Sequence, residues 1–97
     1  MEDGVAHRVM PDIPPGARKT ITGKPAIVIR VTVNPAGNVT DAVVERTFSP
    51  YFSKFALDAA RQWKFIPDDR TTPRRWTLRF EITPANTQVV ARRASGE

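Results

Sequence analysis

The side chains that commonly act as nucleophiles, bases or metal ligands are few in this chain and lie far apart in the sequence. There is no cysteine, and His7 is the single histidine, placed near the N-terminus without a second ligand beside it. Asp68 and Asp69 are adjacent acids, but they have too few neighbouring oxygen ligands for a cation site. No nucleophile, base and orienting acid occur together at a spacing that suits catalysis. The sequence therefore predicts no enzyme, no metal and no cofactor.

Charge is the next property that could indicate a partner. The net charge is +5, but the basic residues are dispersed among ten acids and form no run of five. In residues 75–83 the cationic and aromatic side chains alternate, which places them on opposite faces of a strand. A nucleic-acid platform needs both on one face, so core packing explains Trp76 and Phe80 better. A basic nucleic-acid-binding domain is the weakest alternative, and no nucleic-acid partner is predicted.

The length of 97 residues suits one small domain with a single core. No apolar run approaches the roughly 20 residues that a membrane span requires, and the N-terminus does not resemble a signal peptide. We expect a flexible lead-in at residues 1–10 and a folded domain at 11–84. The tail at 85–97 is expected to be either disordered or an extra short strand through residues 88–90.

Three segments have the two-residue alternation of a half-buried strand. Residues 26–33, AIVIRVTV, alternate cleanly and lead into a turn at 34–38 that contains proline and glycine. Residues 39–47 are rich in β-branched side chains, and a bulge near Asp41 reconciles their imperfect alternation. Residues 74–83, RRWTLRFEIT, alternate again. The first two segments are expected to form a hairpin.

One amphipathic helix is expected between the second and third strands. Ser49 can cap its free N–H groups, and Pro50 suits the first helical position. Pro67 disfavours helical geometry before it, so the helix should end near Trp63 or Lys64. The apolar stripe of this helix consists of Phe52, Phe55, Ala56, Ala59, Ala60 and Trp63.

The fold class that follows is α+β. We expect a three-stranded antiparallel sheet, made of the hairpin and the third strand, with one main amphipathic helix packed on one face. A short helical turn near Ala17–Lys19 is compatible with the N-terminal segment. Trp63 and Phe65 should seal the open end of the sheet before Pro67 turns the chain, so this aromatic pair is expected to be structural.

A series of short motifs occurs in a fixed order among these elements. They are Ile13-Pro14, Ala17 and Gly23, then a strand, Gly37-Asn38-Val39, a second strand, Leu57-Asp58 followed by Ala59-Ala60, Trp63-Lys64-Phe65 with Pro67, and a closing alternating strand. In this order of features the chain resembles the C-terminal domain of TonB-type energy transducers over roughly residues 10–84. Ile13 stands where family members usually have a tyrosine, and the loop DDRTTPRR lacks a glycine that the family often has.

The resemblance implies a periplasmic protein-binding module that belongs to an inner-membrane-anchored protein. Such a domain is expected to engage a segment of a TonB-dependent outer-membrane transporter, and to work with inner-membrane anchor and motor proteins through an upstream region. A TolA-like module that joins envelope proteins is the alternative with the same fold. A homodimer is also compatible with exposed strands.

Strand addition at an exposed sheet edge is the expected mode of binding. The exposed edges should be residues 39–46 and 75–83, and we favour the latter because it alternates more cleanly. An equally weighted interpretation is that the arginines at positions 70, 74, 75 and 79 are only a solvated face that discourages aggregation. The predicted partner-binding residues are Arg75, Thr77, Leu78, Arg79, Phe80, Glu81, Ile82 and Thr83, together with Ile13 and Pro14.

Overall fold

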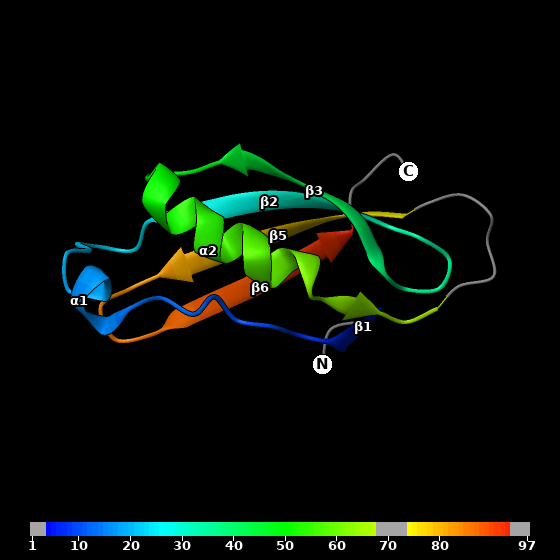
Figure 1. Ribbon diagram of the computed structural model, residues 1–97, viewed down its shortest axis with the longest axis horizontal. Helices are drawn as coiled ribbons and strands as arrows, with labels where there is room; N and C mark the ends of the chain where they lie inside the picture. Colours follow the sequence, from blue (N-terminus) through cyan, green and yellow to red (C-terminus); the bar gives the residue numbers. More distant parts are fainter. Residues whose placement is uncertain (1–3, 68–73, 94–97) are drawn as a thin grey trace.

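The computed structural model describes residues 4–67 and 74–93, which form an α+β fold with one main helix on a four-stranded antiparallel sheet (Figure 1). The strands of this sheet are β2 (Ala26–Val33), β3 (Val39–Arg46), β5 (Arg74–Ile82) and β6 (Thr87–Arg93). Their order is β3-β2-β5-β6. The α+β prediction is confirmed, but the predicted three-stranded sheet is wrong by one strand. The missing strand is β6, which forms from the tail for which disorder or a short strand had both been expected.

The two central strands, β2 and β5, divide their side chains between the two faces of the sheet. Ile27, Ile29, Val31 and Val33 of β2 are fully buried, and the residues between them are partly or fully exposed. β5 follows the same two-residue period, and the two strands pair without a register shift from Ala26–Glu81 to Val33–Arg74. This regular pairing is what the alternating sequence requires, because a slip by one residue would turn every apolar side chain outward.

The β2–β3 hairpin closes on the predicted turn. The N–H of Asn34 donates to the carbonyl of Asn38 at 3.0 Å, and Gly37 has a φ of +95°. The register of β3 shifts between Thr32 and Val33 of β2, so the bulge predicted near Asp41 is confirmed. A second register shift lies between Val28 and Ile29 of β2.

Helix α2 (Pro50–Arg61) covers one face of the sheet (Figure 1) and ends before Pro67 as predicted, but two residues earlier than the expected end near Trp63 or Lys64. Ser49 occupies the N-cap position, but its hydroxyl makes no capping hydrogen bond. Instead, the N–H of Ser49 donates to Oγ1 of Thr47 at 3.0 Å. The capping role predicted for the Ser49 side chain is therefore wrong, because the Thr47 hydroxyl organises this turn. The buried residues of the helix are Phe52, Ser53, Ala56, Ala59 and Ala60.

A second, two-stranded sheet pairs β1 (Val5–His7) with β4 (Lys64–Phe65). His7 and its neighbours, which had been assigned to the lead-in, thus lie in a strand. Trp63 and Phe65 are 0% and 2% exposed, which confirms that this aromatic pair is part of the core. The centres of these two rings lie 6.0 Å apart, and the centre of the Phe65 ring lies 5.0 Å from that of the Trp76 ring. Burial of one such ring stabilises the fold by about 2 to 3 kcal/mol.

The short helix α1 (Pro15–Arg18) forms close to the helical turn expected near Ala17–Lys19. It is tied to the β5–β6 turn by one side chain. The guanidinium of Arg18 donates to the carbonyl of Thr83 and to Oγ1 of Thr87, each at 2.8 Å. This clamp fixes the start of β6 against the N-terminal half of the domain.

Candidate partner-binding surface

The two outer strands of the large sheet are β3 and β6, so the edges on which an extended partner could pair belong to these strands. The prediction that residues 75–83 form an open edge is wrong. β5 hydrogen-bonds to β2 on one side and to β6 on the other, from Trp76–Arg93 to Ile82–Thr87. The extra strand that the sequence left possible at residues 88–90 forms as β6 and covers this edge.

The edge of β6 is regular over its whole length. Its seven residues pair with β5 without a register shift. The carbonyl of Val89 accepts a hydrogen bond from Arg8 of the lead-in, so this group points away from β5. Because the direction of backbone groups alternates along an antiparallel strand, Thr87, Val89 and Arg93 direct their N–H and C=O groups outward. A regular row of outward groups is what an added strand needs.

The edge of β3 is irregular by comparison. Its pairing with β2 is interrupted twice, once near each end. Bulges break the even spacing of outward N–H and C=O groups and increase the local twist, which makes a strand a poorer template for pairing. Of the two edges, β6 is therefore the better one for strand addition.

The predicted binding residues of β5 divide between the core and the face of the sheet that α2 leaves uncovered. Leu78, Phe80 and Ile82 are fully buried, which confirms that Phe80, like Trp76, belongs to the core. Arg75 and Arg79 are exposed, and Thr77 and Glu81 are partly exposed. Thr83 lies in the turn after β5, where its Oγ1 donates to the carbonyl of Asn86 at 3.0 Å.

The uncovered face carries both charge signs. Arg30 pairs with Glu45, and Nε of Arg79 lies 3.4 Å from Oε2 of Glu81. These pairs are solvent-exposed and contribute little to stability. Next to β6, a shallow cavity of about 420 Å³ is lined by Val28, Thr77, Arg79, Glu81, Val90 and Arg92. The structure thus brings three of the predicted binding residues together beside the β6 edge.

The two predicted N-terminal contacts lie in different environments. Ile13 is 6% exposed and packs in the core, whereas Pro14 is exposed and immediately precedes α1. A partner can therefore touch Pro14, while Ile13 acts by holding the lead-in in place. Their role in partner binding stays a prediction.

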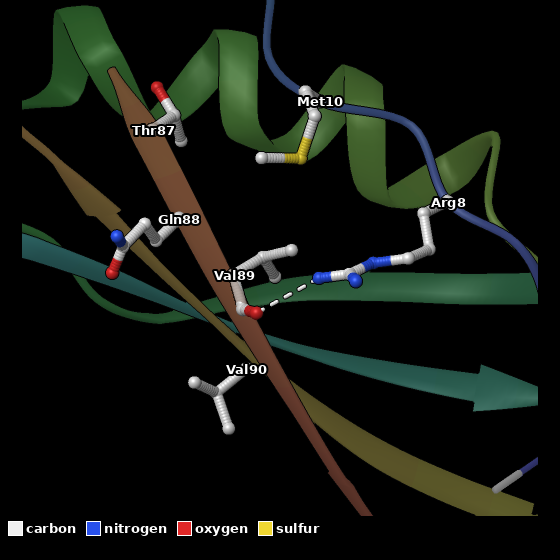
Figure 2. Close-up of a pocket in the computed structure, with 6 residues that line it drawn as sticks. All are labelled: Arg8, Met10, Thr87, Gln88, Val89 and Val90. Carbon is white, nitrogen blue, oxygen red and sulfur yellow. Dashed lines mark hydrogen bonds between the residues drawn. The ribbon is translucent and has the colours of Figure 1, made fainter. Parts of the chain in front are cut away.

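The lead-in, with Arg8 and Met10, lies beside the β6 edge and lines one side of a cavity there (Figure 2). Arg8 reaches from the lead-in to the strand, and its Nη2 donates to the carbonyl of Val89 at 3.0 Å. The guanidinium carbon of Arg8 also lies 5.8 Å from the centre of the Trp63 ring. The cavity between lead-in and strand measures about 580 Å³ and is lined by Arg8, Met10, Thr87, Gln88, Val89 and Val90.

Two arginines have roles that sequence reasoning missed. Arg74, expected on a solvated face, is 7% exposed and donates to the carbonyls of Ile66 and Asn34 at 2.8 and 3.2 Å. Arg74 stands at the start of β5 and alternates in phase with the buried residues of that strand. This phase is the sequence feature that indicates its burial. Arg8 gave no such signal, because its partner is 81 positions away. Arg70, Asp68 and Asp69 lie outside the described residues.

Within residues 4–67 and 74–93, no group of three or more potential metal ligands occurs. In the same part of the chain no helix is long and apolar enough to cross a membrane.

The comparison with known families bears on the stretch from α1 to the end of β5. The model of the family described as Gram-negative bacterial TonB protein C-terminal matches residues 17–83. Arg8 and β6 lie outside the matched residues. No curated protein and no solved structure matches the chain. Since the matched stretch contains the central strands, α2 and the aromatic pair, the chain belongs to the family of C-terminal domains of the Gram-negative bacterial TonB protein.

Proposed function

We propose that this domain is the periplasmic protein-binding module of a TonB-like energy transducer. In this role it binds an extended segment of an outer-membrane transporter, which adds itself as a strand along β6. The observation that carries the proposal is the unbroken register of β6, which leaves evenly spaced backbone groups on the outer side of the sheet. Family membership supports the class of partner. No chemistry is assigned to the domain.

Strand addition divides affinity and selectivity between different groups. Backbone hydrogen bonds along β6 supply affinity that depends little on the partner's sequence. Selectivity comes from side chains on the uncovered face, where Thr77, Arg79 and Glu81 line the cavity beside Val90 and Arg92. These three are the residues of the predicted β5 set that an added strand on β6 can reach most readily. The buried members of that set support the site only by positioning β5.

A transducer also requires a connection to the inner membrane. We infer from the family that inner-membrane anchor and motor proteins act on this domain. Because β3 and β6 are both outer strands, self-pairing into a homodimer is a further expectation. Light scattering across a range of protein concentrations tests the homodimer directly.

The experiment that tests the proposed function is an amide NMR titration with short peptides that scan the periplasmic segments of outer-membrane transporters from the same organism. We expect weak binding, with a dissociation constant of roughly micromolar or higher, because a single strand must order itself on a small interface. Chemical shift changes should concentrate on Thr87–Arg93 and on the neighbouring side of β5. Affinity should change little with salt, whereas a phosphate-driven complex would weaken steeply. Shift changes confined to α2, or a response to nucleic acid alone, would contradict the proposal.

A further inference from the structure

The guanidinium of Arg8 occupies the space in which a strand added to β6 would run. Adjacent strands lie about 4.8 Å apart, and Nη2 of Arg8 is within hydrogen-bonding distance of the outward carbonyl of Val89, at 3.0 Å. We propose that Arg8 is a latch on the β6 edge, and that its hydrogen bond to Val89 must open before a partner strand can pair there. This inference rests on the proposed function and concerns its regulation.

The base of the latch is anchored on the core. The residue after Arg8 is held by a buried side chain, because Nε1 of Trp63 donates to the carbonyl of Val9 at 2.8 Å and Trp63 is fully buried. The Arg8 side chain itself is exposed and passes over the Trp63 ring, 5.8 Å from its centre. Opening of the Arg8–Val89 bond therefore requires the Arg8 side chain to rotate, while Trp63 holds the backbone at Val9.

The geometry in Figure 2 also shows why the latch acts on one point of the edge. Arg8 and Met10 approach β6 from the lead-in side, whereas the side chains of Gln88 and Val90 point away from Arg8. The contact is thus made to the backbone of β6, at Val89, and leaves the side chains of the uncovered face accessible. Such a contact protects a sheet edge against unwanted pairing without covering the surface that selects the partner.

The latch and a direct binding role for Arg8 predict opposite effects on the affinity for a partner strand when Arg8 is removed. If the closed form dominates in the free domain, the apparent affinity for a partner strand is reduced by the fraction of molecules that are open. Loss of one such hydrogen bond should then raise affinity by about 3- to 10-fold. If Arg8 instead contacted the partner, its removal would weaken binding.

The test uses the 97-residue chain, the Arg8→Ala variant and a matched control, Arg46→Ala. Both variants lose one positive charge from an exposed position, but Arg46 lies on β3, at the opposite edge of the sheet. The probe is the tightest-binding transporter peptide of the panel described above, measured by NMR titration. Arg8→Ala should tighten binding, and Arg46→Ala should change it by less than about 2-fold.

A second readout needs no peptide. The carbonyl ¹³C signal of Val89 should move in Arg8→Ala and stay in place in Arg46→Ala, because Arg8 donates to that group and Arg46 lies on the opposite edge of the sheet. An unchanged Val89 signal would overturn the latch whatever the peptides do. Binding that is unchanged or weaker in Arg8→Ala, with a normal control, would overturn the latch alone. Failure of every variant to bind any peptide would overturn the proposed function instead.

Discussion

The indole N–H of Trp63 donates to the carbonyl of Val9 at 2.8 Å, and this bond joins the end of α2 to the lead-in. Trp63 follows α2 directly after its C-cap, is fully buried in the core, and holds the lead-in in place beside β6. The stability of the domain and the shape of its candidate binding edge therefore depend on the same side chain.

Replacement of Trp63 should separate these two contributions. Trp63→Ala removes a fully buried ring and should lower the free energy of unfolding by about 3 to 5 kcal/mol. Trp63→Phe keeps most of the volume but leaves the Val9 carbonyl without its donor, at a cost of about 1 to 2 kcal/mol. Thermal unfolding measures both. A shift of only a few degrees for Trp63→Ala would show that the ring is a surface residue.

The start of α2 provides a test of where its capping comes from. Because the Ser49 hydroxyl makes no capping hydrogen bond, Ser49→Ala should change the free energy of unfolding by less than about 0.5 kcal/mol. Thr47→Ala should cost about 0.5 to 1.5 kcal/mol, since Oγ1 of Thr47 bonds both the N–H and the carbonyl of Ser49. Chemical denaturation measures which variant loses more free energy of unfolding. A larger loss for Ser49→Ala than for Thr47→Ala would show that the Ser49 hydroxyl caps the helix after all.

Arg74 should prove structural although it stands in an arginine-rich segment. It is 7% exposed and bonds two backbone carbonyls, so Arg74→Met should destabilise the domain by about 2 to 3 kcal/mol. Arg79→Ala is the matched control on the same strand. It breaks an exposed pair with Glu81 and should cost less than about 1 kcal/mol. Equal effects in urea unfolding would refute the structural role of Arg74.

The backbone geometry of the hairpin turn requires glycine at position 37. Its φ is +95°, and a Cβ added there would lie 2.0 Å from the carbonyl oxygen of Phe65. Gly37→Ala should therefore cost about 2 kcal/mol or more, combining strain with this clash. Gly16→Ala in α1 is the control, because an added Cβ there would meet no described atom within 4 Å outside its own helical turn and alanine favours helix. The prediction fails if the melting temperatures of both variants equal that of the parent.

The sequence was sufficient for the parts of the fold that carry strong periodicity. β2, β5 and α2 each bury one face against a single core, so their alternation or helical stripe specifies them locally. β6 was less certain because TQVVARR is short and only Val89 of it is buried. Without β6, β5 would be the outer strand of the sheet. The uncertainty about β6 therefore led to the wrong prediction that residues 75–83 form the binding edge. The Arg8–Val89 contact joins distant parts of the chain and has no local pattern.

The central claim is that a partner segment pairs with the backbone of β6, and intermolecular NOEs measure this most directly. The isotope-labelled domain is saturated with an unlabelled transporter peptide from the scan. The account predicts a ladder of backbone NOEs between the peptide and alternate residues of β6, including Val89, as strand pairing requires. A bound peptide whose NOEs lead only to α2, or only to side chains of the uncovered face, would contradict it.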